Sequence, residues 1–317
     1  MPMNIHKLTV PTPFYVGPVN VYLIDQDPLT LVDVGPNTDE AWNALQAELR
    51  RVGREVRDLR RILISHAHTD HFGLAGRVQE VSGARVFIHD WDAPRLKRDP
   101  DYTCHNMLLH RAGVPNEVTQ GFKAGYESVK ELAYHLLDVD TLKDEDEILF
   151  QNSALRVVHT PGHTPGSICL LRESTRHLLA ADTLLKHITP NPTLHADPVD
   201  EQRRFPSLSE YLCSLARIKE MAPTYIQTGH GDDIADYSEH FHTLVHYTDR
   251  RQQKVIQFVQ QKQSVTAWEL SRYLFPNTKD VHIYLGVSEA QAHLDLAVAE
   301  GKLQLEKRGP VDFFRPA

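Results

Sequence analysis

Three histidines and an aspartate with the spacing of metal ligands stand within six residues, at His66, His68, Asp70 and His71. Residues 62–65 before them are apolar or small, as in a buried strand, and Gly73 follows where a helix opens. Imidazole nitrogens and carboxylate oxygens are donors that Zn²⁺, Fe²⁺ and Mn²⁺ accept. A single histidine means little in a chain with 19 of them, but H-x-H-x-D-H with these flanks predicts a metal site.

This motif resembles the signature of the metallo-β-lactamase superfamily, and three later segments continue the resemblance in the family's order. His163 lies in the T-P-G-H-T-P-G-S segment of residues 160–167. Asp182 follows the strand-like L-L-A-A of residues 178–181, and His230 lies in a T-G-H-G loop. The resemblance spans about residues 15–235. It implies an α/β fold, the four-layer αββα sandwich, with metals at one edge between the two sheets.

The resemblance also implies two metal sites. One metal would take His66, His68 and His163, the other would take Asp70, His71 and His230, and Asp182 would bridge them. Two divalent ions about 3.5–4 Å apart can share a water and make hydroxide available at neutral pH. Asp70 is predicted to act as a ligand and also to take the proton released when that hydroxide attacks. We expect Zn²⁺, although the same donors also hold Fe or Mn.

Composition narrows the class of protein. The chain has 317 residues, 41% of them hydrophobic, which is enough for one large and one small domain. It shows no apolar run near the ~20 residues of a membrane span and no signal-peptide pattern, so a cytoplasmic protein without membrane contact is expected. The net charge of −8 gives no footprint for general nucleic-acid binding. Three distant cysteines predict neither a disulfide framework nor a thiolate zinc site.

Several helices and strands can be placed around the motif. Residues 19–24 and 29–33 have the pattern of a β-hairpin, and Thr38 or Asn37 can cap a helix to about Arg51. Asp33 at the hairpin's end is either a group that steers a ligand histidine or an ordinary turn residue. Ser207-x-x-Glu210 is a capping-box pattern for a helix to about Met221.

Residues 91–140, which we call the helical insertion, separate the two halves of the ligand set. Helices are expected at residues 91–97 and 118–137, where they could form a lid over the metals. Tyr102 and His105 are candidate pocket residues, and plain helical packing is the alternative. Downstream of Asp182, Lys186 and His187 could pair with an anionic substrate group and Asn191 could shape the same rim. Solvated loop residues are the alternative there.

Residues 249–317 form the expected C-terminal unit, after a catalytic domain of residues 1–248. Helices are expected at residues 250–261, from the capping box at Thr266 and at residues 288–300, followed by a hairpin around residues 307–310. This order resembles a winged helix. The third helix carries no basic residue, and residues 250–317 hold ten Lys and Arg against seven Asp and Glu. This balance favours packing or self-association over nucleic-acid binding.

The ligand set and Asp182 favour a hydrolase of small esters, thioesters or lactones, resembling the glyoxalase II and lactonase branches of the superfamily. A single-strand-specific endoribonuclease is the alternative, because similar C-terminal units occur on an RNA-cutting branch. A mono-iron persulfide dioxygenase is a further alternative, and it would hold one iron instead of two metals.

Overall fold

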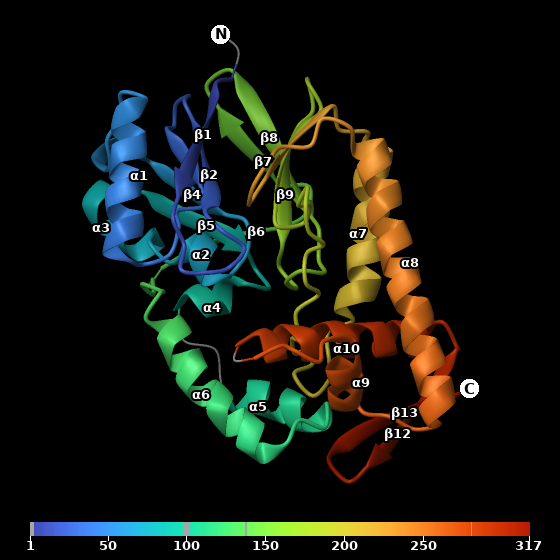
Figure 1. Ribbon diagram of the computed structural model, residues 1–317. Coiled ribbons are helices and arrows are strands. Elements are labelled where there is room, and N and C mark those ends of the chain that lie inside the picture. The colour runs from blue at the N-terminus through green and yellow to red at the C-terminus, as the bar shows by residue number, and fades with distance from the viewer. Residues whose placement is uncertain (1–2, 98–101, 137, 280) are drawn as a thin grey trace.

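The computed structural model describes residues 3–97, 102–136, 138–279 and 281–317, without the side chains of residues 102, 122–128 and 281. Two β-sheets lie face to face at its centre (Figure 1). The first has the order β1-β2-β3-β4-β5-β6, formed by Ile5–Val10, Val19–Ile24, Thr30–Val32, Arg61–Ile64, Arg85–His89 and Asp140–Leu142. The second has the order β11-β10-β9-β8-β7, formed by Tyr225–Thr228, His177–Ala181, Ile168–Arg172, Ser153–His159 and Glu147–Phe150.

The two sheets contain both parallel and antiparallel strand pairs. β1, β2 and β3 are antiparallel, whereas β3 to β6 run parallel and are joined by helical crossovers. β2 and β3 are buried throughout, as expected for strands covered on both faces. In the second sheet only the β10–β11 pair is parallel.

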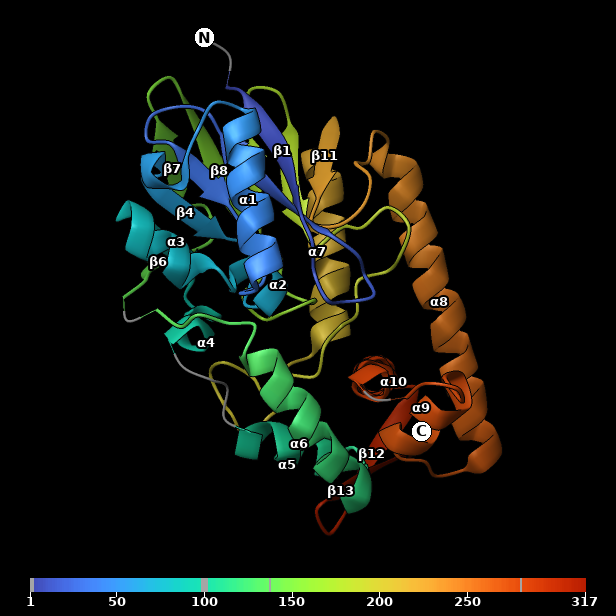
Figure 2. The same ribbon diagram turned by 60° about the vertical axis from the view of Figure 1, so that its left-hand side comes forward.

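Helices cover the outer face of each sheet. α1 (Asp39–Arg51) and α3 (Ala75–Ser82) lie outside the first sheet, while α7 (Ser207–Met221) and α8 (Tyr237–Lys262) lie outside the second (Figures 1 and 2). Three apolar clusters match these layers, since one lies under α1 and α3, one between the sheets and one under α7 and α8. The expected four-layer αββα sandwich is therefore confirmed.

The helical insertion supplies three helices: α4 (Ala93–Lys97), α5 (Tyr102–Arg111) and α6 (Asn116–Lys130). The C-terminal unit supplies α9 (Ala267–Leu274), α10 (Val281–Ala299), β12 (Leu303–Arg308) and β13 (Val311–Pro316). α5 and α6 lie beside these C-terminal elements rather than on the sheets (Figures 1 and 2). Leu108 and Leu109 of α5 share one apolar cluster with Val259, Leu270 and Phe314. The insertion and the C-terminal unit thus form a fourth core together.

Some helix boundaries differ from those expected. α8 is one continuous helix across residues 248 and 249, so the predicted domain boundary falls inside it. α10 begins at Val281 instead of residue 288, and the predicted capping box of α7 is wrong. Ser207 is the first residue of α7, and its hydroxyl donates to the carbonyl of Thr193 instead of capping the helix. The capping box of Thr266 and Glu269 at α9 is confirmed.

Candidate metal centre

The loop after β4 brings the first four predicted ligands to one place. β4 ends at Ile64, and α2 (Thr69–Phe72) begins after His68, whose backbone is still extended. His66 and His68 therefore project from a loop, while Asp70 and His71 project from the first turn of α2. The side chains of Asp70 and His71 are buried, so this loop holds ionisable groups away from water.

Three further strand ends supply the remaining ligands. His163 follows β8, Asp182 follows β10 and His230 follows β11, each by one to four residues. β8, β10 and β11 belong to the second sheet, whereas β4 belongs to the first. The seven predicted ligands therefore come from both sheets and meet at the edge between them.

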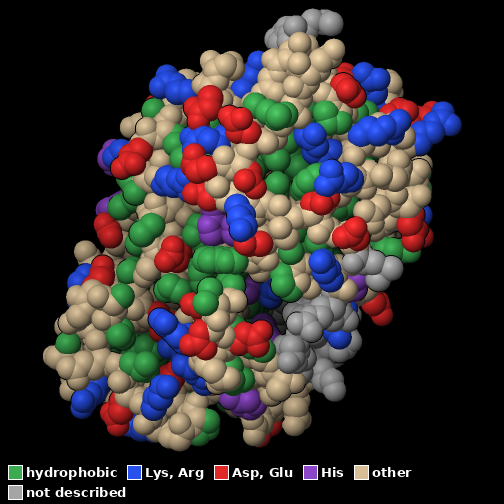
Figure 3. All heavy atoms as spheres, turned by 180° about the vertical axis from the view of Figure 1, so that it is seen from behind, with side chains coloured by type: hydrophobic (Ala, Val, Ile, Leu, Met, Phe, Trp, Pro, Cys, Tyr) green, Lys and Arg blue, Asp and Glu red, His purple; other side chains and the backbone are tan. Residues whose placement is uncertain are grey.

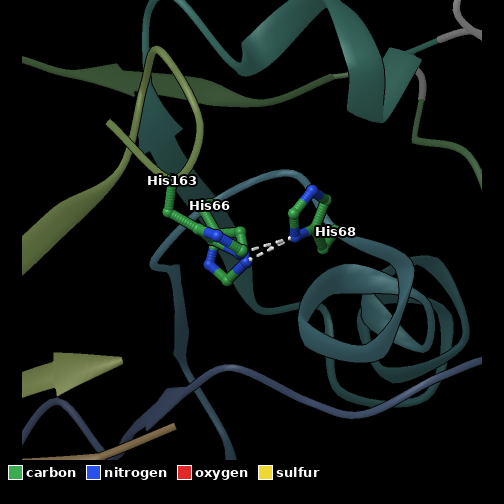
Figure 4. Close-up of side chains that lie close together, drawn as sticks. All are labelled: His66, His68 and His163. Carbon is green, nitrogen blue, oxygen red and sulfur yellow. Dashed lines mark hydrogen bonds between the residues drawn. The ribbon is translucent and has the colours of Figure 1, made fainter. Parts of the chain in front are cut away.

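The donor atoms of these residues lie within coordination distance of common points. His68 Nδ1 is 3.0 Å from His66 Nε2 and 2.9 Å from His163 Nε2, and the three rings converge (Figure 4). His230 Nε2 is 3.4 Å from an oxygen of Asp70. For a tetrahedral ion with bonds of about 2.0–2.1 Å, donor atoms lie about 3.3 Å apart. The two groups fit that spacing.

Asp182 lies between the two groups. Its carboxylate oxygens are 3.5 Å from His71 Nε2, 3.7 Å from His163 Nε2 and 3.6 Å from His230 Nε2. One carboxylate thus faces a histidine of each predicted site. This is the position that a bridging ligand requires.

Several of these atoms are buried without a hydrogen-bond partner among the described residues. They are His71 Nε2, His230 Nε2 and Asp182 Oδ1. Buried polar atoms are normally satisfied, because an unmet donor or acceptor costs about 1–3 kcal/mol. Orphaned nitrogen and oxygen atoms that face one another satisfy this requirement by binding a cation, so the donor set fits divalent metal ions.

The outward nitrogens of the ligand rings are held by the protein. His163 Nδ1 donates to the carbonyl of Asn191 at 2.8 Å, and His230 Nδ1 donates to the carbonyl of Pro18 at 2.9 Å. His71 Nδ1 lies 2.8 Å from a carboxylate oxygen of Asp33. Because a carbonyl only accepts, the Nδ1 atoms of His163 and His230 carry the proton and their Nε2 lone pairs point into the centre.

Asp33 also fixes the loop that carries His66. Its carboxylate accepts from the backbone N–H of Ser65 at 2.8 Å and from the Ser65 hydroxyl at 2.7 Å. Of the two interpretations of Asp33, the structure supports the group that orients a ligand histidine. A turn residue alone would not need a buried carboxylate with three partners.

Burial and neighbouring charge shift the pKa values of the ligands in opposite directions. Burial lowers the pKa of His66 and His68 well below the usual value, and the surrounding histidines add to the effect. Burial acts to raise the pKa of Asp182, but His230 and His71 outweigh it and hold that pKa well below its usual range. His66, His68 and His163 therefore offer neutral imidazoles beside an ionised carboxylate, which are the forms that bind metals. Burial acts to lower the pKa of His71 and His230 as well, but the nearby carboxylates, Asp182 above all, outweigh it and raise both pKa values.

Comparisons with known proteins agree with this geometry. The family model of the metallo-beta-lactamase superfamily matches residues 14–230, which contain all seven ligands. The chain belongs to the metallo-beta-lactamase superfamily. The match ends at His230, so α8, α9, α10 and the last two strands lie outside it.

Three relatives of this superfamily member resemble it over nearly its full length. "Probable metallo-hydrolase YqjP" of Bacillus subtilis is 29% identical, and the alignment covers 98% of both chains. The crystal structure of the metallo-beta-lactamase family protein TTHA1429 from Thermus thermophilus is 29% identical with a TM-score of 0.84, and 98% of each chain is covered. A beta-lactamase domain protein from Burkholderia ambifaria has a TM-score of 0.83 at 22% identity, covering 100% of this chain and 93% of that one. The last likeness shows the fold alone.

The structure does not bring the predicted substrate residues together as it does the predicted metal ligands. Lys186 and His187 both face Asp232, at 3.6 and 3.0 Å, and are largely exposed. They border a cavity of about 420 Å³ between their own loop, α7, α8 and α10, and none of the seven ligands lines it. Asn191 orients His163 through its carbonyl, and its side-chain amide donates to Leu285 of α10 at 3.0 Å. The side chain of Tyr102 lies outside the described part of the chain.

Sequence reasoning missed Asp92, which ties the two halves of the centre together. Its buried carboxylate accepts from the N–H of Ala67 at 2.8 Å, from the Thr164 hydroxyl at 2.8 Å and from the N–H of Gly166 at 2.9 Å. It thus fixes the loops of His66 and His163 relative to each other. The available signal was an acid just after a buried strand, here β5, as with Asp33 and Asp182.

Within the described residues, no helix is both long and apolar enough to cross a membrane.

Proposed function

We propose that this protein is a metal-dependent hydrolase that cleaves a small ester, thioester or lactone at a binuclear centre. The observation that carries the proposal is the bridging position of Asp182 between two sets of convergent donor atoms. One set is His66, His68 and His163, and the other is Asp70, His71 and His230. The printed name of the Bacillus subtilis relative, a probable metallo-hydrolase, supports hydrolysis.

The expected cofactor is a pair of divalent ions, Zn²⁺ first, with Fe or Mn accepted by the same donors. Such ions supply a Lewis acid and lower the pKa of water enough to give hydroxide at neutral pH. The chain's own contribution is to orient the rings of His71, His163 and His230 with Nε2 toward the centre, through Asp33, Asn191 and Pro18. No serine or cysteine nucleophile is required.

Asp70 is proposed to accept the proton that the nucleophile loses. Its carboxylate is buried and lies 3.4 Å from His230 Nε2 through one oxygen. A carboxylate that is held through one oxygen can accept a proton at the other. Replacing Asp70 with Asn keeps the shape and removes the base, so turnover should fall. Full turnover with both metals retained would contradict this role.

The helical insertion and the C-terminal unit meet beside the metal loops, and this arrangement favours a small substrate. His105 of α5 and Tyr284 of α10 have ring centroids 4.8 Å apart, so the helical insertion meets the C-terminal unit beside the metal loops. Seen from behind, the surface has a hollow with basic and histidine side chains in view (Figure 3). A centre bordered by the helical insertion and the C-terminal unit admits a small molecule more readily than a folded polymer.

The test compares the metal-loaded protein with an Asp182→Ala variant on thioesters, lactones and labelled single-stranded RNA. We expect carbonyl hydrolysis that the variant loses by more than 100-fold, with the RNA intact. RNA cleavage lost in the variant, with inert esters, would replace this proposal with the endoribonuclease. The metal content, measured by mass spectrometry, is expected to be about two ions per chain, and one iron would indicate the dioxygenase.

A further inference from the structure

Residues 189–195, which we call the His163 support, connect a metal ligand to the C-terminal unit. The segment contains neither helix nor strand, and its residues 192–195 are buried. A buried segment of this kind lacks the regular hydrogen bonds of a helix or sheet, so other groups must satisfy its backbone. The contacts that fix the His163 support therefore also determine where it holds His163.

Two hydrogen bonds connect the support to His163. His163 Nδ1 donates to the carbonyl of Asn191 at 2.8 Å, and the Thr193 hydroxyl donates to the carbonyl of His163 at 2.6 Å. The Thr193 hydroxyl is itself held, because His195 Nε2 lies 2.6 Å from its oxygen. One segment thus fixes both the ring and the main chain of this ligand.

Two further hydrogen bonds connect the support to α10. The side-chain amide of Asn191 donates to the carbonyl of Leu285 at 3.0 Å, and the Tyr284 hydroxyl donates to the carbonyl of Leu194 at 2.9 Å. Asn191 therefore bonds a ligand ring through its main chain and α10 through its side chain. This is a direct connection between the C-terminal unit and a metal ligand.

The residues on either side of Asn191 make this connection stiff. Pro190 has a fixed φ, and Pro192 restricts the residue before it to extended backbone conformations. The main chain of Asn191 therefore has few alternative conformations, and a change at its side-chain contact displaces its carbonyl. α10 lies outside residues 14–230, which match the family model, so this contact belongs to the C-terminal unit of this chain.

We propose that the C-terminal unit is part of the metal centre, because α10 positions His163 through Asn191 and Tyr284. The inference rests on the proposed binuclear centre. The first ion is the one expected at His66, His68 and His163, and the second ion is the one expected at Asp70, His71 and His230. Asn191 and Tyr284 act through His163 and are positioning residues. Affinity for the first ion therefore depends on α10.

Two variants break the two contacts with α10 separately. Tyr284→Phe removes only the hydroxyl that donates to Leu194, and Asn191→Ala keeps the carbonyl that accepts from His163. Zinc is titrated in competition with a chromophoric chelator, and the binding step that is lost in His163→Ala identifies the first ion. Each variant should weaken the first ion by about 10-fold and leave the second unchanged, because the support of one ligand ring is loosened.

Tyr237→Phe is the matched control. The Tyr237 hydroxyl also donates to a main-chain carbonyl at 2.9 Å, that of Leu215, but this bond joins α8 to α7 instead of α10 to the His163 support. Tyr284→Phe and Tyr237→Phe should lower the thermal midpoint by similar amounts, whereas only Tyr284→Phe should weaken the first ion. With cobalt in place of zinc, only Tyr284→Phe should shift the visible absorption of the first ion, because His163 moves.

Equal affinity for the first ion in wild type, Asn191→Ala and Tyr284→Phe would overturn the inference. An equal loss in Tyr237→Phe would also overturn it, because the loss would then follow from stability alone. A wild-type protein that hydrolyses no ester, yet loses metal affinity in Tyr284→Phe and not in Tyr237→Phe, would support the role of α10 and reject the hydrolase proposal.

Discussion

Four of the five ligand histidines place Nε2 in the metal centre and give Nδ1 to the protein, and His68 is the exception. A ring held by its second nitrogen cannot rotate freely, so the lone pairs stay directed inward when no ion is bound. The orientation of these four rings is therefore set by the groups bonded to Nδ1, on the side away from the centre. Substitution of one of these groups is therefore expected to change metal affinity, as substitution of a ligand would.

Asp33→Asn is expected to weaken metal binding by about 10- to 100-fold, because the ionised acceptor for His71 Nδ1 is lost. Asparagine suits the substitution, since the backbone at Asp33 has a φ of 58°, which Asn tolerates. Competition with a chromophoric zinc chelator measures the affinity. The matched control is Asp39→Asn on α1, whose carboxylate is exposed. Equal affinity in wild type and Asp33→Asn would show that Asp33 is only a turn residue.

Gly229 leaves room for the bridging carboxylate. A Cβ atom at this position would lie 2.1 Å from Asp182 Oδ1 and 3.1 Å from a ring carbon of His71. Gly229→Ala must therefore displace Asp182, and we expect loss of at least one of two metal ions and of most activity. Gly121→Ala is the control, because nothing lies within 4 Å of its Cβ. Two bound ions in Gly229→Ala, counted by mass spectrometry, would contradict the bridging position.

At the scale of helices and strands, the features that could be predicted from the sequence are those that depend on residues adjacent in the chain. The H-x-H-x-D-H loop, the capping box at Thr266 and the hairpin near residues 307–310 are all set by local residue types. The start of α10 was missed because its first turns are stabilised from afar, through Asn191 to Leu285 and Tyr284 to Leu194.

The contact between α8 and α10 predicts a pH dependence of stability. His293 of α10 is buried against Gln252 of α8, and burial, with the charge of Arg251, lowers its pKa to about 3. Between pH 6.5 and 3 the unfolded chain binds a proton here that the folded chain does not. The free energy of unfolding therefore falls as the pH drops below 6.5, by about 2 kcal/mol at pH 5 from this residue.

His293→Gln removes that titration. Urea unfolding at pH 7 and pH 5 should show a decrease about 2 kcal/mol smaller in the variant than in wild type, whatever the variant's stability at pH 7. His282→Gln is the control, because His282 is only half-buried at the start of the same helix. An equal decrease in the His293→Gln and wild-type proteins would mean that His293 is accessible to protons in the folded state.

At the scale of the whole molecule, a buried ionic network joins three parts of the chain. Arg204, between β10 and α7, pairs with Asp295 of α10 at 2.8 Å and with Asp312 of β13. Arg111 of α5 reaches the same Asp312 at 3.2 Å. Removing one partner of such a network leaves an uncompensated buried charge, which costs about 3–5 kcal/mol. The network thus joins the segment between β10 and α7, the helical insertion and the C-terminal unit.

A chain ending at residue 248 is therefore not expected to fold as a separate catalytic domain. Truncation there cuts α8 and removes the partners of Leu108 and Leu109, so the apolar face of α5 would be exposed. We expect aggregation or loss of near-ultraviolet circular dichroism, and no tight metal binding. Intact full-length protein is the control, because it keeps every partner of α5, including Asp312 and Phe314 of β13. A monomeric truncated chain that binds two metals would instead establish residues 1–248 as an independent domain, with the insertion stable without the C-terminal unit.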